Sequence, residues 1–430
     1  MKFGYLKDIF ASYAWKRLTA VEVDPKSSHG HEFNASDKLR EILGTTTRKC
    51  KKGTGFPTRC FYFADDEDEI IESTACLSWY DSRARHATRT EWRLYYTDNP
   101  VFGIAGRARA GDTLVIAFSA GLENATAIAA AAGSTAESQL QWLFGIQEKG
   151  ELGLVPAKVA TDALVDGTRA RILEAMGLEL PAKDERLLSE MLKRFHGDFP
   201  RAQVFSEFIR AGLPDVRAED GADDALLAWM EKEEFAFRVL ERHLIRSRIR
   251  AGFKDVDDFV ACSLSVQNRR KARAGRAFES HLSEIFRTSG LSFEQGAQVE
   301  NKARPDFLFP GADQYFDSGF PIAWLTILGA KTSCKDRWRQ VLAEGKRLRA
   351  KHLVTLEPAI SGNQLAEMRD AALQLVVPTP LQATYPDNER ARLWDLTTFI
   401  EAVRDKQSRA GIAPDFTGRT AKPKRRKKTA

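Results

Sequence analysis

WLTILGAKTSCKDRWRQVLAE, residues 324–344, is the stretch of sequence that decides the fold of the C-terminal half of this chain. Its first part is apolar and predicts a buried β-strand that ends at Lys331. Its second part has helical spacing from about Asp336 onward, which places Arg337 and Glu344 on one face of a helix. The charged side chains at this strand-to-helix junction are the first candidates for a functional site.

The segments around this junction predict an α/β domain with a mixed sheet. RPDFLFP at 304–310 begins a strand before it, and HLVTLE and LQLVVPTP predict strands after it. Two long helical blocks come first in the chain, DALLAWMEKEEFAFRVLERHLIRSRIRAGF and DVDDFVACSLSVQNRRKARAGRAFESHLSEIFRTSG. Helices that alternate with strands in this order are typical of an α/β domain.

Three of these residues together suit phosphodiester hydrolysis. If the strand after Asp306 pairs with the strand that ends at Lys331, both side chains point into one cleft. Carboxylates can hold Mg²⁺, which lowers the pKa of a bound water, and a cation can orient that water and stabilise the developing charge. The usual second acid, two residues before the lysine, is Gly329 here. Glu344 is therefore the candidate acid that reaches back from the helix.

The start of the predicted helix could also read DNA. Arginine side chains recognise guanine N7 and O6, and an aspartate can accept from the cytosine amino group. Asp336, Arg337 and Arg339 would then face G·C pairs while the neighbouring residues cut the backbone. From spacing alone, a loop Pro-Asp, a snorkelling lysine and a solvated Arg-x-Arg explain the same residues equally well.

Composition sets the broad class of the protein. The chain has 430 residues, enough for two or three domains, and no run of about 18 apolar residues. The N-terminus lacks a signal-peptide core, so we expect a cytoplasmic protein without a membrane partner. Five scattered cysteines without CxxC spacing argue against a disulfide framework and against a structural zinc site.

The positive net charge is concentrated at one end. The total is +6, and the segment from Arg419 onward carries seven Lys and Arg residues and no acid, so subtracting this +7 leaves −1 for the rest. The folded body is therefore not basic overall. The end of the chain is expected to be a disordered basic arm, which could attract phosphate without reading sequence or could simply be solubilising.

The N-terminal part predicts a β-rich domain. FYFA at 61–64, LSWY at 77–80 and DTLVIAFS at 112–119 have strand composition. STAESQLQWLFGI predicts a closing helix with Ser134 or Thr135 as its N-cap. Small strands with irregular spacing favour a barrel or sandwich over a doubly wound sheet. The following residues are helical and polar and contain the joint GLPDVRAEDGADD, so they are expected to link two domains.

Longer motifs add a family resemblance. SVQNRRKARAGRAFESHLSEIF, RPDFLFP and GAKTSCKDRWRQVLAEGKRLRAKHLVTL resemble the catalytic domain of the EcoRII family of type II restriction endonucleases, which has the PD-(D/E)xK fold. That family has Pro-Asp, then Lys-x4-acid-Arg-x-Arg, then a glutamate five residues beyond the last arginine. The resemblance covers roughly residues 235–400 and implies a displaced second acid, which accounts for Gly329. The matching residues are Pro305, Asp306, Lys331, Asp336, Arg337, Arg339 and Glu344.

The N-terminal part resembles that family's effector-binding domain, a DNA-binding pseudobarrel of the plant B-three type. YAWKRLTAVEVD, GHEF and YDSRARHATRTEWR carry this resemblance. Two arms grip the duplex in that fold, and two family lysines are replaced here by Ala87 and Trp92. The resemblance implies that the arms of this chain contain His31, Glu32, Arg89, Glu91 and Arg93. A polar β-hairpin loop, or a metal site at His29 and His31, would be the alternatives.

The resemblance, together with the residues above, implies a Mg²⁺-dependent type II restriction endonuclease of a restriction–modification system, which would act as a homodimer on double-stranded DNA at CCNGG or CCGG sites. An effector domain at 1–155 would bind a second site and relieve autoinhibition allosterically, ahead of a linker at 156–225, a catalytic domain at 226–408 and a basic tail at 409–430. Asp306 and Glu344 would ligate the metal, Lys331 would activate the water, and Glu279 on the preceding helix would assist. The residues expected to contact substrate DNA are Lys335, Asp336, Arg337 and Arg339.

Two other functions fit parts of the same pattern. A sequence-specific DNA-binding regulator would need the DNA contacts but not Asp306, Lys331 and Glu344 together. A repair or resolvase nuclease on the same core would prefer mismatched or branched DNA. EKEEFAF at 231–237 offers no counterpart of the family arginine that holds a flipped base, so base flipping is left open.

Overall fold

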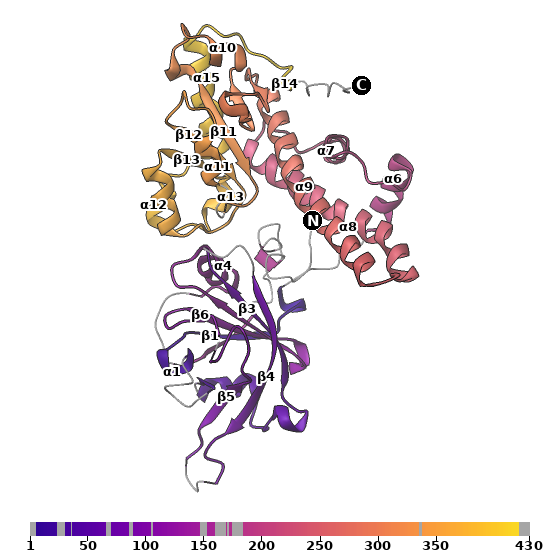
Figure 1. Cartoon of the computed structure of the whole chain (residues 1–430), viewed down its shortest axis with the longest axis vertical. Coiled ribbons are helices and arrows are strands. Elements are labelled where there is room, and N and C mark those ends of the chain that lie inside the picture. Colours follow the sequence, from indigo (N-terminus) through magenta and orange to yellow (C-terminus); the bar gives the residue numbers. More distant parts are fainter. Residues whose placement is uncertain are drawn as a thin grey trace. The chain divides into compact units, whose positions relative to one another are not determined.

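The computed structural model forms two compact units, one from residues 2–180 with 359–364 and the other from 181–358 with 365–430. Figure 1 draws the first from indigo to magenta and the second from magenta to yellow. The residues that the structure describes are 6–23, 31–35, 37–65, 70–85, 89–104, 106–146, 153–159, 169, 172–173, 184–334 and 338–420.

The N-terminal unit is built on an eight-stranded sheet with the order β2-β5-β4-β3-β7-β6-β1-β8. Most neighbours are antiparallel, and β3 and β7 are parallel. A β-bridge between Ala35 and Leu154 joins the two ends of this order, so the strands close into a barrel. The strands are β1 (Ser12–Arg17), β2 (Glu32–Asn34), β3 (Phe56–Phe63), β4 (Ile71–Asp81), β5 (Trp92–Tyr96), β6 (Thr113–Phe118), β7 (Ala125–Ala130) and β8 (Val155–Lys158).

Large aromatic residues fill the inside of this barrel. Phe33, Phe56, Trp79 and Tyr96 are fully buried in one cluster. The outer face of β1, β6 and β7 is covered by α4 (Thr135–Phe144), which packs in a second apolar cluster. The predicted N-cap is confirmed, because the Ser134 side chain accepts a hydrogen bond from the Glu137 amide. The other helices of this unit are α1 (Ala20–Val23) and α3 (Arg40–Leu43).

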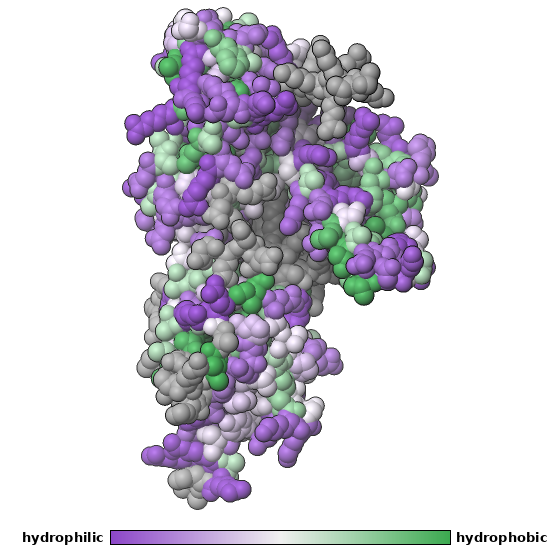
Figure 2. Space-filling model, in the orientation of Figure 1, coloured by the Kyte–Doolittle hydropathy of each residue, from purple (hydrophilic) through white to green (hydrophobic). Residues whose placement is uncertain are grey.

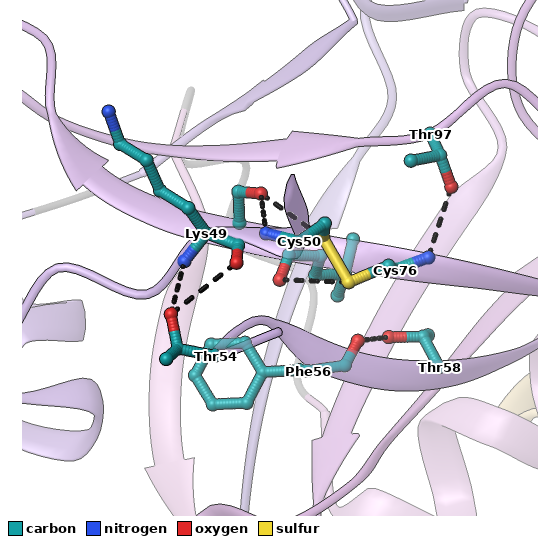
Figure 3. The surroundings of a disulfide bond; sticks show 9 residues. Lys49, Cys50, Thr54, Phe56, Thr58, Cys76 and Thr97 are labelled. Atoms are coloured by element: carbon teal, nitrogen blue, oxygen red, sulfur yellow. Dashed lines mark hydrogen bonds between the residues drawn. A yellow bond between two sulfur atoms is a disulfide. The ribbon is translucent and has the colours of Figure 1, made fainter. Parts of the chain in front are cut away.

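The expectation that the cysteines form no disulfide framework is wrong for one pair. Cys50 and Cys76 form a disulfide with an S–S distance of 2.07 Å (Figure 3). Cys76 lies opposite Pro57 in the antiparallel pair β3–β4, and the short 3-10 helix Cys50–Lys52 brings Cys50 back beside β4. This proximity comes from strand pairing, which cysteine spacing does not reveal. Cys60, Cys262 and Cys334 are free.

The C-terminal unit combines a helical layer with a six-stranded sheet of order β13-β12-β11-β10-β9-β14. The strands β9, β10 and β11 are antiparallel, whereas β11, β12 and β13 are parallel. The predicted mixed sheet is therefore confirmed. Its strands are β9 (Glu294–Gln295), β10 (Phe307–Phe309), β11 (Thr326–Lys331), β12 (Lys351–Thr355), β13 (Leu373–Val376) and β14 (Arg419–Thr420).

Two long helices precede the sheet and pack side by side (Figure 1). They are α8 (Ala222–Ala251) and α9 (Val256–Thr288), and the side chain of Asp255 caps the start of α9. Among the described residues, no helix has both the length and the apolar character needed to cross a lipid bilayer. The remaining helices are α6 (Glu185–Phe195), α7 (Ala202–Ala211), α10 (Ala312–Phe316), α11 (Trp338–Ala343), α12 (Gly362–Asp370), α13 (Thr379–Gln382), α14 (Asp387–Arg390) and α15 (Leu396–Arg409).

The structure divides the chain differently from the predicted segments. Residues 156–158 belong to β8, and α6 and α7 of the predicted linker pack against α8 and α9, where α7 buries Phe205 and Ile209. The predicted tail also begins later than residue 409. Arg419 pairs with Glu294 of β9, which adds β14 to the sheet. Residues 421–430, the most basic part of the predicted arm, lie outside the described residues.

Candidate active site

Asp306 and Lys331 meet at the junction of two paired strands. β10 and β11 pair antiparallel with Phe307 opposite Leu328, so Asp306, just before β10, lies beside the end of β11. The Lys331 Nζ donates to Asp306 Oδ2 at 2.7 Å, and the Ala330 amide donates to the same oxygen at 2.7 Å. Both side chains are largely buried. Strand register thus fixes the carboxylate and the ammonium group as a pair.

Close packing of a helix explains why the second acid is displaced. A Cβ atom built at Gly329 would lie 2.5 Å from Val341 Cγ2 of α11, which is too close for any side chain. The position two before Lys331 therefore has no room for a carboxylate. Glu344 follows α11 directly, and its amide donates to the Val341 carbonyl at 3.2 Å. The contact that excludes an acid at 329 also holds Glu344 near the pair.

The electrostatic environment of Glu344 links it to the same pair. Burial and, to a smaller extent, the negative charge of Asp306 raise the pKa of Glu344 to about 7, although Lys331 and Lys351 oppose this shift. Its Oε2 atom is buried without a hydrogen-bond partner among the described residues. A buried, unpaired carboxylate oxygen close to another carboxylate is costly unless a cation or proton joins it.

Glu279 approaches the site from α9. Burial raises the pKa of Glu279, the charge of Asp306 adds to this, and Lys331 works against it. Gln295 of β9 donates to Glu279 Oε2 at 3.2 Å. The four predicted catalytic residues are thus electrostatically coupled around Asp306 and Lys331. Sequence reasoning missed Gln295, because nothing in its local pattern distinguishes it from other polar strand residues.

A buried polar network holds α9 in place. His281, two residues after Glu279, is fully buried and lies 2.9 Å from Glu233 of α8 through its Nε2 atom. Arg210 of α7 contacts His281 Nδ1 at 3.0 Å. Burial lowers the pKa of His281. The network joins α7, α8 and α9 close to Glu279. In the sequence, the feature that could have pointed to it is a histidine within an apolar helical stripe.

The residues present fit a hard divalent cation. Among the described residues there is no cluster of three or more His, Cys, Asp or Glu side chains that could hold a metal by itself. Mg²⁺, however, commonly keeps several waters and binds through one or two carboxylates together with substrate phosphate. Asp306 and Glu344 supply these carboxylate oxygens, and the unpaired Glu344 Oε2 is a free donor atom. These two carboxylates are therefore the candidate ligands for the predicted metal.

The predicted DNA-reading residues of this unit are only partly described. Lys335, Asp336 and Arg337 lie outside the described residues. Arg339, near the start of α11, donates to Glu367 of α12 at 2.7 Å and lies over the Trp338 ring at 4.7 Å. Both partners of this ion pair are about half exposed, so the guanidinium group is accessible from solvent.

The predicted arm residues of the N-terminal unit are partly brought together. β2 and β5 pair antiparallel with Asn34 opposite Arg93, which puts Glu32 and Arg93 in an ion pair. Arg93 also donates to Glu91 at 2.6 Å. His31 contacts the Tyr96 ring, with centroids 5.5 Å apart, and Arg89 is exposed. Glu32, Glu91 and Arg93 therefore form one charged cluster, and His31 borders it.

Two further residues belong to this cluster. The Tyr80 hydroxyl donates to Glu32 Oε1 at 2.5 Å, and Arg83 pairs with Glu91 at 2.5 Å. Burial, together with the hydrogen bond to Glu32, raises the pKa of Tyr80 to about 12. Tyr80 pairs with Arg93 of β5 near the end of β4, and Arg83 follows β4 two residues after its last residue, Asp81. Arg83 lies in the basic segment YDSRAR, and this pattern could have identified it as a candidate from the sequence.

Comparison with known proteins gives three findings. The family model described as EcoRII C terminal matches residues 237–400. The type II restriction enzyme EcoRII of Escherichia coli is 38% identical to this chain over 245 residues, which are 56% of this chain and 59% of that enzyme. The match thus spans less than two thirds of the length of that relative.

Solved structures give weaker likenesses. Metal-depleted Ecl18kI in complex with uncleaved, modified DNA has a TM-score of 0.43 and 16% identity, and covers 54% of this chain and 86% of Ecl18kI. The complex of restriction endonuclease PspGI with substrate DNA has a TM-score of 0.42 and 13% identity, and covers 49% of this chain and 94% of PspGI. Residues 237–400 of the chain thus match the EcoRII C-terminal family model, and the chain is similar to the EcoRII restriction enzyme, as the motifs around Asp306 and Lys331 predict.

Proposed function

We propose that this protein is a Mg²⁺-dependent type II restriction endonuclease that hydrolyses double-stranded DNA at a specific short site. The observation that carries the proposal is the convergence of Asp306, Lys331 and Glu344 at one junction between β10, β11 and α11. A DNA-binding regulator has no need for a buried carboxylate with an unpaired oxygen next to a lysine–aspartate pair.

Each residue has a role that follows from its contacts. Mg²⁺, when bound, would activate a water and neutralise charge on the scissile phosphate. Asp306 and Glu344 would hold it through carboxylate oxygens. The Lys331 ammonium group now pairs with Asp306 at 2.7 Å, and it can turn toward the attacking water or a phosphate oxygen when DNA arrives. Glu279 would assist Lys331 from α9.

We further propose that the substrate site is of the CCNGG or CCGG kind. Arginine and aspartate are the residue types that read guanine and cytosine in the major groove, and Arg339 is exposed at the start of α11. Lys335, Asp336 and Arg337 would complete this reading surface. The similarity to the EcoRII restriction enzyme supports the same assignment.

The N-terminal barrel is proposed to be the effector domain. A closed eight-stranded barrel with a charged cluster of Glu32, Glu91 and Arg93 at one end suits a pseudobarrel that grips a duplex with two arms. Binding of a second DNA site there would relieve autoinhibition of the catalytic unit. Such coupling is allosteric only if effector DNA favours one of two states of the protein.

The active form is proposed to be a homodimer that forms through the end of the α8–α9 hairpin. Hydrophobic side chains gather over this end in Figure 2. The end of α8 is basic, with exposed Arg246 and Arg250, whereas the start of α9 is acidic, with exposed Asp255 and Asp257. A two-fold axis would place each basic end against the partner's acidic end. The exposed apolar residues are Ile249, Val256, Phe259, Val260 and Leu264.

Plasmid cleavage in Mg²⁺ tests the catalytic assignment. Wild type should cut DNA at a specific site, and Lys331→Ala should reduce the rate by at least about 100-fold, because the ammonium group that stabilises the transition state is lost. Lys193→Ala, which removes an exposed lysine of α6, is the matched control and should cut normally. Equal cleavage by wild type and Lys331→Ala would refute the proposal, and binding without cleavage in Mg²⁺ or Mn²⁺ would favour a regulator.

Sequencing the cut ends would identify the target site. Once the target site is known, plasmids that carry one or two copies of it can test the effector proposal. Wild type should cut the two-site plasmid faster, and Arg93→Ala should abolish this difference. Equal rates on both plasmids for wild type would argue against autoinhibition. Preference for branched or mismatched DNA over the intact site would instead indicate a repair or resolvase nuclease.

A further inference from the structure

The N-terminal unit carries a basic loop that none of the assigned arm residues includes. Residues 44–54, GTTTRKCKKGT, contain Arg48, Lys49, Lys51 and Lys52 and no acidic residue. Lys51 and Lys52 are exposed, and they have no ion pair within the described part of the chain. The three threonines 45–47 are exposed as well. This segment, called the lysine loop below, therefore presents cations and hydroxyl groups to solvent.

Strand pairing places the lysine loop beside the proposed arms. Arg48 and Trp79 form a β-bridge with backbone hydrogen bonds of 2.7 and 2.8 Å. The loop therefore lies beside the C-terminal end of β4, on the side of β4 that does not pair with β5. The end of β4 leads directly into segment 82–91, which contains Arg83 and Arg89.

A side-chain contact joins the loop to the charged cluster. The Lys49 Nζ lies over the Tyr80 ring, 5.4 Å from its centroid, and the Tyr80 hydroxyl donates to Glu32. Glu32 in turn pairs with Arg93. A continuous row of contacts therefore runs from the lysine loop to the residues proposed to grip DNA.

The loop is held in one conformation by a cross-link and by local hydrogen bonds (Figure 3). The Cys50–Cys76 disulfide ties it to β4, and the Cys50 amide donates to Ser78 Oγ at 3.1 Å. Within the loop, the Lys49 amide donates to Thr54 Oγ1 at 2.9 Å. A Cβ atom at Gly55 would lie 2.6 Å from both sulfur atoms, so the disulfide fits only because residue 55 is glycine.

We propose that the lysine loop is a third DNA-contacting segment of the effector domain, in which Lys51 and Lys52 bind the phosphate backbone of the effector duplex and the Cys50–Cys76 disulfide holds them in position. This inference rests on the proposed effector function. Phosphate is the ligand that an exposed cluster of lysines beside a DNA-binding arm recognises, and it carries no sequence information. A pre-ordered loop binds more tightly because less conformational entropy is lost on binding.

DNA titrations of the full-length protein test the proposal. Fluorescence anisotropy with a labelled duplex, in EDTA to prevent cleavage, gives the number of duplexes bound, the affinity and its salt dependence. Lys51→Ala/Lys52→Ala should keep the number of duplexes, weaken binding roughly tenfold and lower the slope of log K against log salt by about 2. Lys193→Ala/Arg194→Ala removes two neighbouring exposed charges from α6 and should behave as wild type.

Reduction of the disulfide provides the second measurement. Dithiothreitol supplies the two electrons and two protons that convert the disulfide to two thiols and is itself oxidised to a cyclic disulfide. Reduced wild type and Cys50→Ser/Cys76→Ser should bind about threefold to tenfold more weakly, with an unchanged salt slope, because the lysines remain but are less ordered. Cys262→Ser, at a free cysteine of α9, is the control. Circular dichroism and thermal melting establish that the variants are folded.

The outcomes separate this inference from the proposed function. If Lys51→Ala/Lys52→Ala matches the α6 control in affinity and slope, the lysine loop does not contact DNA, although the effector function stands. If reduction leaves the affinity unchanged, the positioning role of the disulfide is refuted. If wild type and Arg93→Ala bind the same number of duplexes with equal affinity, the effector function itself fails, and the lysine-loop proposal fails with it.

Discussion

Glu344 shows how the surroundings of one residue prepare a site for a cation. It stands immediately after α11, its Oε2 atom has no hydrogen-bond partner within the described residues, and burial raises its pKa to about 7. A proton occupies this carboxyl group at mildly acidic pH. A divalent cation that binds both Glu344 and Asp306 would replace that proton, because metal ligands must be deprotonated.

This shift predicts how stability depends on pH. Because the pKa of Glu344 is higher in the folded protein than the ordinary value of 4.5, the folded state binds more protons between pH 4.5 and 7. Its contribution is fully present below about 4.5 and is lost as pH rises through 7. Urea unfolding in EDTA at pH 5.5 and 7.5 should therefore show a larger loss of stability for wild type than for Glu344→Gln.

Magnesium gives the matching control for this prediction. Added Mg²⁺ should stabilise wild type more at pH 7.5 than at pH 5.5, since the carboxylates are ionised at the higher pH. Glu344→Gln should respond weakly at both pH values. Equal pH dependence of the two proteins in EDTA would show that Glu344 titrates normally, and the argument for a cation at this position would lose its electrostatic basis.

At the scale of elements, the contact between β11 and α11 sets the geometry of the site. Gly329 allows Val341 to approach the strand so closely that no Cβ atom fits between them. The same contact packs α11 against β11, and Glu344 directly follows that helix. The position of the second acid is therefore a property of strand–helix packing.

Gly329→Ala should destabilise the protein by about 1–3 kcal/mol, because the added methyl group overpacks the contact with Val341. Cleavage in Mg²⁺ should also fall, since a shifted α11 displaces Glu344. The double variant Gly329→Ala/Val341→Ala should lose less stability than the sum of the single variants, which a double-mutant cycle in urea measures.

Gly275→Ala is the control for this prediction. Gly275 lies within α9, and a Cβ atom there would meet nothing within 4 Å. Alanine should be neutral or stabilising at this position, because glycine is unfavourable in a helix interior. If Gly329→Ala were as harmless as Gly275→Ala, the packing explanation for the displaced acid would be wrong.

For the molecule as a whole, the α8–α9 hairpin end governs the proposed assembly. Val256 and Phe259 are 74% and 53% exposed there, between a basic and an acidic helix end. Burying such residues in a symmetric interface removes apolar surface from water, which favours association. A two-fold dimer would also give each DNA strand of a palindromic site its own active site.

Val256→Asp/Phe259→Asp should therefore shift the protein from dimer to monomer in sedimentation equilibrium, because charge enters the apolar centre of the interface. Ile322→Asp/Phe316→Asp changes two comparably exposed residues elsewhere in the C-terminal unit, and should leave the protein dimeric. A dimer that persists in the hairpin variant would place the interface on another surface, and a monomeric wild type would refute the assembly altogether.

The sequence by itself determined the strand that ends at Lys331, the mixed sheet, a helix capped by Ser134 or Thr135, and the set of candidate catalytic residues. These follow from local patterns: apolar runs, helical spacing, capping residues and the order of motifs along the chain. The local pattern also showed that the usual acid is absent at Gly329, and it named Glu344 as the candidate replacement.

Only the tertiary structure decided how those residues meet. The 2.7 Å contact between Lys331 and Asp306, the Cys50–Cys76 disulfide and the addition of β14 to the sheet all join segments that are distant in sequence. Strand register and helix packing bring such segments together, and both depend on the whole set of side chains that must be buried at once. No short window of sequence contains that information, so the disulfide was missed. For the same reason, the sequence shows that an acid is absent at Gly329, but only the folded structure shows the crowding that excludes it.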